Sequence, residues 1–179
     1  MIIGKRAEYL IAYYSRKGNN IVGGRIENLS VGNTEVAAKM IKELTGSNMF
    51  RIEAANSYPE DYVKATEVAQ QELRTNARPL LASQVEHMDY YKVIFLGYPN
   101  WWGTMPMPVF TFLEEYDFSG KTIVPFCTHE GSRLGRSEKD IAKLCPKAII
   151  TKGLAIRGSD VKNAHGEVSK WLSEIGMIE

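Results

Sequence analysis

The 179-residue sequence predicts an α/β fold, a doubly wound three-layer sandwich in which helices cover both faces of a five-stranded parallel sheet. Short runs rich in β-branched and aromatic residues alternate with longer segments of helical period. Two of the short runs are almost wholly apolar, which is typical of central strands covered on both faces. Each predicted strand is followed by one helix, and right-handed crossovers then favour a doubly wound sheet.

The predicted strands begin with residues 9–14, which read Tyr-Leu-Ile-Ala-Tyr-Tyr. This run and the third strand, residues 93–98, are apolar along most of their length, so we expect both in the middle of the sheet. The other strands are predicted over residues 49–53, 122–128 and 148–156.

The predicted helices lie between these strands. In the first one, apolar residues recur at helical spacing and Gly46 follows as a C-terminal stop; they are Val36, Ala37, Met40, Ile41 and Leu44. Further helices are predicted over residues 61–75, 109–116, 137–144 and 161–175, with prolines near several of their ends. Since no repeat or linker interrupts the pattern, we expect residues 1–179 to form one domain.

Residues 15–32 break the alternation. They contain three glycines within residues 16–25 and show no sustained period, so we predict a long loop. Loops of this length are uncommon inside compact domains and are usually functional or mobile.

Composition excludes several classes of protein. With 22 Lys and Arg against 21 Asp and Glu, the net charge of +1 provides no long-range field, so we expect no nucleic acid and no membrane as partner. Cys127 and Cys145 form no C-x-x-C pair and are too few for a disulfide scaffold. No apolar run approaches the ~20 residues that span a bilayer, and residues 1–6 lead into no signal-peptide segment. We therefore expect a cytoplasmic protein.

Small polar residues around the first predicted crossover form a candidate anion site. A helix N-terminus after a strand gathers free backbone N–H groups and the positive end of the helix dipole. We expect Ser15 and Lys17 from the strand end, and Asn33 and Thr34 from the start of the helix, to hold a phosphate group. The alternative is that Asn33 or Thr34 only caps the helix.

The third predicted strand leads into an aromatic loop at 98–108, Tyr-Pro-Asn-Trp-Trp-Gly-Thr-Met-Pro-Met-Pro. Because the carboxyl ends of parallel strands face one crevice, we expect this loop to meet the anion site. Trp101 and Trp102 offer flat apolar surface on which a fused heteroaromatic ring can stack, and Gly103 lets backbone approach that ring. The alternative is that a tryptophan merely covers the end of the sheet.

The fourth predicted strand ends in a glycine-spaced polar turn, Phe-Cys-Thr-His-Glu-Gly-Ser-Arg-Leu-Gly-Arg at 126–136. Its hydroxyls and main-chain amides can hydrogen-bond the polar edge of a heteroaromatic cofactor. His129 and Glu130 do not complete the zinc motif H-E-x-x-H, because Arg133 stands at the last position, so we expect no metal. For His129, an exposed position in a capping loop is an equal alternative.

These segments resemble the flavodoxin family, whose phosphate loop has the pattern T/S-x-T-G-N-T after the first strand. Here the pattern is split into Ser-Arg-Lys at 15–17 and Gly-Asn-Thr at 32–34, while the Y-P-x-W-W-G and P-F-C-T-x-x-G-S-x-x-G loops are similar to those of one subfamily. The resemblance covers nearly the whole chain and implies the strand order 2-1-3-4-5 and a bound FMN. It assigns flavin contacts to Pro99, Asn100, Trp101, Trp102, Gly103 and Thr104, and to Cys127, Thr128, His129, Gly131, Ser132 and Gly135.

The resemblance implies an FMN-binding redox protein that transfers electrons through the flavin. One alternative is an NAD(P)H-dependent FMN quinone reductase, in which NAD(P)H would be a visiting substrate because no G-x-G-x-x-G motif occurs. A remote alternative is a non-catalytic flavodoxin-like binding module. The electron donor and acceptor stay open, either NAD(P)H and a quinone or a protein redox partner. The loop from Gly18 to Ser30 is left with two roles, covering the flavin or joining a second subunit in a homodimer.

Overall fold

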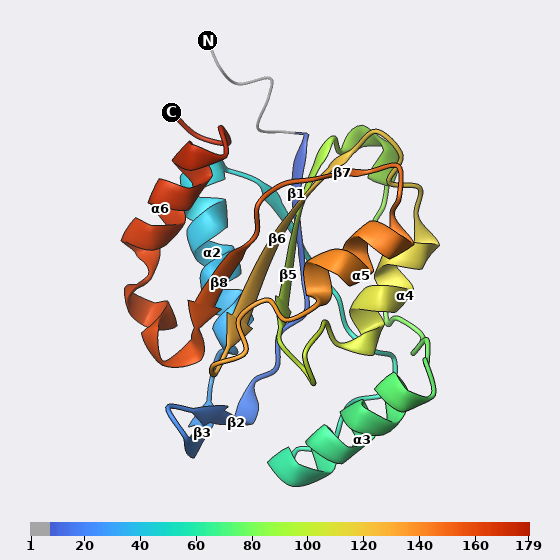
Figure 1. Ribbon diagram of the computed structural model, residues 1–179, viewed down its shortest axis with the longest axis vertical. Coiled ribbons are helices and arrows are strands. Elements are labelled where there is room, and N and C mark those ends of the chain that lie inside the picture. The colour runs from blue at the N-terminus through green and yellow to red at the C-terminus, as the bar shows by residue number, and fades with distance from the viewer. Residues whose placement is uncertain (1–7) are drawn as a thin grey trace.

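The computed structural model describes residues 8–179 and confirms the predicted doubly wound α/β sandwich (Figure 1). The strands of its main sheet are β1 (Tyr9–Tyr13), β4 (Asn48–Arg51), β5 (Val93–Pro99), β6 (Thr122–His129), β7 (Ile149–Ile150) and β8 (Leu154–Arg157). All their pairings are parallel, and the order β4-β1-β5-β6-β7 corresponds to the expected 2-1-3-4-5.

The fifth position of the sheet holds two short strands where the sequence predicted one over residues 148–156. β7 pairs with the start of β6, and β8 pairs with its end. Between them, the amide of Gly153 donates a hydrogen bond to the carboxylate of Glu138 at 3.2 Å. The sheet therefore has six strands rather than five, although the order of positions is unchanged.

Helices cover both faces of this sheet (Figure 1). They are α2 (Asn33–Thr45), α3 (Tyr62–Arg74), α4 (Met107–Glu115), α5 (Ser137–Leu144) and α6 (His165–Glu174). α2 and α6 lie on one face, and α4 and α5 lie on the other. The last predicted helix, residues 161–175, is divided into a 3₁₀ turn, η2 (Gly158–Asn163), and α6.

No helix within residues 8–179 is long and apolar enough to cross a membrane. Residues 1–6, whose sequence argued against a signal peptide, lie outside the described residues.

Side chains of β1 alternate between two cores, which explains why this strand is apolar throughout. Leu10 and Ala12 pack in the cluster that includes α4 and α5, whereas Ile11 and Tyr13 pack in the cluster that includes α2 and α6. A strand covered on both faces needs an apolar residue at every position. The central strands are thereby fixed in place, and their carboxyl ends form one stable edge.

The prediction of a long loop over residues 15–32 was wrong. β2 (Gly18–Val22) and β3 (Arg25–Leu29) form an antiparallel hairpin there. Gly23 and Gly24 make its two-residue turn with φ values of 60° and 81°, the positive values that a type I′ turn requires. Both strands are short; β2 is partly buried and β3 is largely exposed, so they lack the apolar alternation that marks a buried strand. This hairpin and α3 both lie at the edge of the sheet where the parallel strands end (Figure 1).

Candidate functional site

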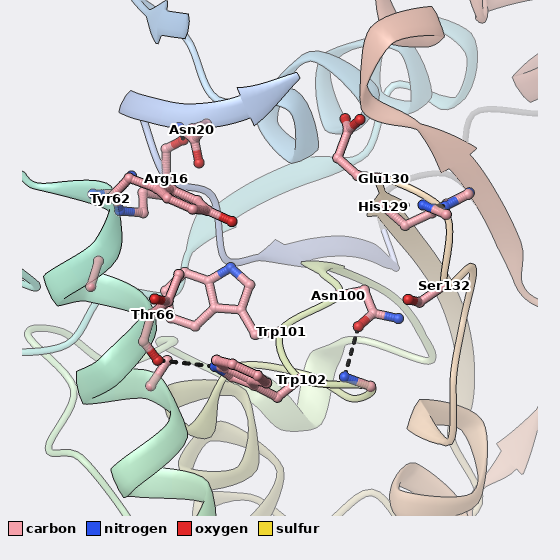
Figure 2. A pocket seen from close by; sticks show the side chains of 14 residues that line it. Arg16, Asn20, Tyr62, Thr66, Asn100, Trp101, Trp102, His129, Glu130 and Ser132 are labelled. Atoms are coloured by element: carbon pink, nitrogen blue, oxygen red, sulfur yellow. Dashed lines mark hydrogen bonds between the residues drawn. The ribbon is translucent and has the colours of Figure 1, made fainter. Parts of the chain in front are cut away.

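Two adjoining cavities lie at the carboxyl ends of the parallel strands, where ligands bind in doubly wound folds, and Figure 2 shows the larger one. We call the larger one, of about 520 Å³, the aromatic cavity, because Tyr62, Trp101 and Trp102 line it. The smaller one, of about 170 Å³, is the polar cavity, and it extends to the hairpin and the start of α2. The side chains that line both are Arg16, Asn20, Tyr62, Asn100, Trp101, His129 and Glu130.

The polar cavity ends at the first turn of α2. The first four N–H groups of any helix have no partner within that helix. Those of Glu35 and Val36 are satisfied, because Ser15 Oγ accepts from Glu35 at 3.1 Å and a main-chain carbonyl accepts from Val36 at 3.2 Å. Among the described residues, the N–H groups of Asn33 and Thr34 have no acceptor, and both residues line the cavity. Two free amides at a helix N-terminus form a binding site for an anion.

Gly32 allows the end of β1 to approach the start of α2. Any side chain at this position would clash with Ser15 Oγ and with the carbonyl of Arg16. The two halves of the split phosphate motif therefore meet in space, although the hairpin separates them in the sequence. Ser15 itself is buried and supports the first turn of α2 from behind, whereas Asn33 and Thr34 face the cavity.

The positively charged residue that lines the cavities is Arg16 and not the predicted Lys17. Lys17 is exposed and lines neither cavity. The guanidinium of Arg16 lines both, and it donates to the main-chain carbonyls of Asn19, Pro59 and Glu60, the last two at 2.9 Å. Within residues 8–179 no carboxylate forms an ion pair with it. Its charge is uncompensated and favours an anionic ligand.

Thr34 and Thr128 are joined across the polar cavity. Their hydroxyl oxygens lie 2.8 Å apart, and both side chains are buried. Two hydroxyls that share one hydrogen bond use only one of their two hydrogens, so one hydrogen remains free. The pair can therefore donate to an acceptor in the cavity that both residues line.

An ion pair between Glu35 and Arg51 stabilises the first turn of α2. Arg51 Nη1 donates to Glu35 Oε2 at 2.7 Å, and Nη2 donates to the carbonyl of Ser15 at 3.1 Å. Burial alone would raise the pKa of Glu35, but hydrogen bonds from Lys39 and Arg51 outweigh burial and lower it. Glu35 is therefore charged at neutral pH and ties β4 to the first turn of α2.

The aromatic loop forms a tight turn. Trp101 and Thr104 exchange main-chain hydrogen bonds at 2.9 and 3.3 Å, and the residues between them, Trp102 and Gly103, have φ values of 56° and 87°. Positive φ at both central positions is typical of a type I′ turn. Asn100 Oδ1 accepts from the Gly103 amide at 2.9 Å, and Asn100 Nδ2 donates to a carbonyl of the loop between β6 and α5 at 2.8 Å (Figure 2). The turn is thereby held against the neighbouring loop.

The two tryptophans have different surroundings. The Trp101 indole packs edge-on against Tyr14 and Tyr58, with ring centroids 5.2 Å apart in each case. Trp102 is 49% exposed, and its Nε1 donates to the carbonyl of Thr66 on α3 at 3.0 Å (Figure 2). A bulky residue with positive φ costs about 1–3 kcal/mol and is concentrated at functional sites. The backbone of Trp102 is therefore strained, and the residue lines the aromatic cavity.

His129 is buried rather than exposed, and it lines both cavities. Its Nδ1 accepts a hydrogen bond from the Gly131 amide at 2.9 Å, so the neutral ring carries its hydrogen on Nε2. Burial lowers the pKa of His129, and the positive charges of Arg157 and Arg133 lower it further. The ring is thus a neutral N–H donor at neutral pH.

Three predicted site residues lie behind the cavities. Thr104 Oγ1 donates to Asp140 Oδ2 at 2.5 Å and ties the aromatic loop to α5. Cys127 is fully buried, and burial raises the pKa of its thiol. Gly135 has a φ of 54° and lies against the carbonyl of Gly103, where any side chain would clash. These residues support the two loops, whereas Pro99, Asn100, Trp101, Trp102, Gly103, Thr128, His129, Gly131 and Ser132 line a cavity.

Sequence reasoning missed four residues that line both cavities: Arg16, Asn20, Tyr62 and Glu130. Tyr62 opens α3, which also supplies a wall of the aromatic cavity at helical spacing through Ala65, Thr66 and Ala69. That spacing was readable, but nothing in the sequence placed α3 beside the tryptophan loop. Asn20 lies on the hairpin that was expected to be a loop.

A family model described as flavodoxin matches residues 27–175 of the chain. Among solved structures, a candidate flavoprotein from Bacteroides eggerthii is 27% identical and has a TM-score of 0.76, with 94% of this chain and 98% of that one covered. A second, from Bacteroides uniformis, is 26% identical, with a TM-score of 0.73 and coverage of 93% and 98%. A flavoprotein from Lactobacillus acidophilus in complex with FMN is 21% identical and shares the fold, with a TM-score of 0.67 and coverage of 92% and 98%. No curated protein matches the chain.

Proposed function

This chain belongs to the flavodoxin family, and we propose that it binds one FMN and transfers electrons through the bound flavin. One observation carries the proposal. A polar cavity with two free helix amides adjoins a larger cavity walled by Tyr62, Trp101 and Trp102. FMN consists of a flat ring system joined to a phosphate by a hydroxylated chain, so a connected anion site and aromatic cavity fit its shape and its chemistry.

At the phosphate end, the ligand groups are the free amides of Asn33 and Thr34 and the spare hydroxyl hydrogen of the Thr34 and Thr128 pair. Arg16 adds positive charge from the other side of the cavity. Hydrogen bonds from these groups to a charged phosphate are worth roughly 1.5–3 kcal/mol each.

Glu130 lies where the two cavities join, and it fits the chain between phosphate and ring. Its Oε1 is buried and has no hydrogen-bond partner among the described residues. Buried acceptors without a partner are rare in folded proteins and call for an explanation. The hydroxyl groups of the ribityl chain of FMN are donors that satisfy such an acceptor.

At the ring end, Trp101 and Trp102 supply flat apolar surface, and the main-chain amide of Ser132 supplies a donor for the polar edge. His129 adds a neutral N–H group. When bound, FMN supplies reversible one-electron and two-electron chemistry, and the chain orients the ring and limits its contact with water. The complex of the Lactobacillus acidophilus flavoprotein with FMN, in the same fold, supports this assignment.

NAD(P)H-dependent reduction of a quinone-like acceptor is a second candidate, which the rim of the aromatic cavity favours. Trp102 is half-exposed there and Tyr62 lies on the facing helix, so a flat acceptor would find aromatic surface beside the flavin. The net charge of +1 also gives the chain little attraction for a basic protein partner.

Anaerobic reduction of the FMN-loaded protein tests both roles. The protein is mixed with NADH or NADPH, and the loss of flavin absorption is followed with time. Reduction at about 1–10³ s⁻¹, the usual range of enzyme turnover, supports a reductase. Bound FMN that is reduced by dithionite but not by either nucleotide supports an electron carrier. Failure to bind FMN would overturn both roles.

A further inference from the structure

The β2–β3 hairpin forms one wall of the polar cavity. Its side chains Asn20, Ile21 and Leu29 line that cavity, together with Glu130 and Gly158 from other loops. The cavity is therefore bordered by the hairpin, the first turn of α2 and those loops. A phosphate bound at the free amides of α2 would lie under the hairpin.

Arg16 holds the base of the hairpin. Its guanidinium joins the carbonyl of Asn19 to those of Pro59 and Glu60, which precede α3. Asn20 Nδ2 donates back to the Arg16 carbonyl at 2.9 Å. The base is thus fixed to the side of the site that α3 forms.

The side chain of Glu130 fixes the tip of the hairpin, which is the turn at Gly23 and Gly24. Its Oε2 accepts from the amide of Gly23, in the hairpin turn, at 2.9 Å. Arg157 Nη1 donates to the main-chain carbonyl of Glu130 at 3.0 Å and fixes the loop that carries this carboxylate. No residue of the hairpin belongs to either core cluster of the described chain, so these polar contacts decide its position. The hairpin is tied at both ends, on opposite sides of the site.

We propose that this hairpin is a strap that closes the phosphate end of the site and selects FMN over FAD. FMN ends at its phosphate, whereas FAD continues from the same phosphate into an adenylate group. The polar cavity, of about 170 Å³, has room for a terminal phosphate, and Asn20, Ile21 and Leu29 of the hairpin line it. An adenylate attached to that phosphate would meet the hairpin, whereas FMN has no group beyond its phosphate. The inference rests on the proposed function, because it concerns how the FMN site discriminates between flavins.

Excision of the strap tests this inference. Gly18 and Leu29 are paired across the ladder, so their Cα atoms are about 5 Å apart and a single glycine in place of residues 19–28 can join them. Dissociation constants for riboflavin, FMN and FAD are measured by quenching of flavin fluorescence. We expect the intact protein to bind FMN at least about 100-fold more tightly than FAD, and the excised protein less than about tenfold more tightly.

A second pair of variants releases only the tip. Glu130→Ala removes the acceptor for the Gly23 amide, and Glu130→Gln, which keeps an acceptor oxygen, is its matched control. FMN and FAD share the ribityl chain, so loss of its proposed contact with Glu130 weakens both flavins alike and leaves the ratio of their affinities unchanged. We therefore expect Glu130→Ala to lose part of the preference for FMN over FAD, because the tip is released, and Glu130→Gln to keep that preference even where its affinity for both flavins falls. Similar FMN and FAD affinities in the intact protein would contradict the proposal that the hairpin selects FMN over FAD. An unchanged preference for FMN in Glu130→Ala would contradict it as well. An intact protein that binds none of the three flavins overturns the proposed function instead.

Discussion

The hydroxyl oxygens of Thr34 and Thr128 lie 2.8 Å apart, and this hydrogen bond joins the first turn of α2 to the end of β6. The two segments were predicted separately, one for a phosphate and one for the edge of a flavin ring. Because the bond leaves a single hydroxyl hydrogen free, the pair acts as one donor toward the polar cavity.

Substitution of Thr34 by Val together with Ser15 by Ala should weaken FMN binding far more than riboflavin binding. The double change removes a hydroxyl donor and the support that Ser15 Oγ gives to the Glu35 amide. A lost hydrogen bond to a charged group is worth about 1.5–3 kcal/mol, so we expect FMN affinity to fall at least about tenfold. Fluorescence titration with both flavins measures this. Thr128→Val, which breaks the same bond without touching α2, is the control. Equal losses for FMN and riboflavin would argue against a phosphate contact.

Replacement of Trp102 by Ala should shift the visible spectrum of the bound flavin and leave stability nearly unchanged. The indole is half-exposed, so its removal loses little buried apolar surface. Trp101→Ala should shift the spectrum and also destabilise the flavin-free protein by about 2–4 kcal/mol, because it removes the ring that packs against Tyr14 and Tyr58 and leaves a cavity there. Absorption spectra and urea unfolding report these effects.

Trp102→Phe serves as the matched control for Trp102→Ala. It keeps an aromatic ring but lacks the donor to the Thr66 carbonyl. Stacking predicts that Phe preserves most of the spectral effect of Trp. If neither Trp101→Ala nor Trp102→Ala changes the spectrum, the tryptophans do not contact the ring.

His129 should be neutral at pH 6.5, with its hydrogen on Nε2. Burial and two arginines lower its pKa below 6.5, and Gly131 donates to Nδ1. Because the folded state resists protonation, the neutral ring contributes stability that is present above pH 6.5 and is lost as the pH falls below it. Nitrogen-15 NMR of the imidazole rings, assigned with His129→Asn, gives the tautomer and the protonation state. A ring protonated at pH 6.5, or one with hydrogen on Nδ1, contradicts the assignment.

Substitution of Glu35 by Gln should cost about 1–2 kcal/mol of unfolding free energy at pH 7, because it weakens the charged bonds to Arg51 and Lys39. The pKa of Glu35 is lowered below 4.5, so its contribution is present above pH 4.5 and disappears as the pH falls through the lowered value. Urea unfolding at several pH values measures the difference. Lys39→Met removes only the more exposed partner and should cost less than about 0.5 kcal/mol. A cost for Glu35→Gln that does not depend on pH would contradict the ion pair.

The fold was predictable where burial leaves a mark in the sequence. β1 and β5 are apolar because both of their faces are covered, and Gly46 ends α2 in the left-handed conformation that its position suggested. The β2–β3 hairpin was missed because its strands are short and neither is buried, although Gly23-Gly24 is a known hairpin signal. The division of the fifth strand was missed as well; a contact between distant residues, from the Gly153 amide to the Glu138 carboxylate, lies at the break, and no local pattern reveals it.

The candidate site was predictable to the extent that strand order determines which loops meet. The loops after β1, β5 and β6 had to share one edge, and the structure brings Asn33, Trp101 and His129 together there. Side-chain direction was not predictable, so Lys17 was chosen where Arg16 faces the cavities. The wall that α3 forms was not predictable either, because the position of Tyr62 depends on tertiary packing.

Titration of flavin-free protein with FMN, followed by gel filtration and a visible spectrum of the protein peak, tests the central claim most directly. We expect one FMN per chain in that peak, with a spectrum that differs from the spectrum of free FMN. A protein peak without flavin absorption at excess FMN would contradict it, and the two cavities would then lack the ligand that their shape and donors indicate.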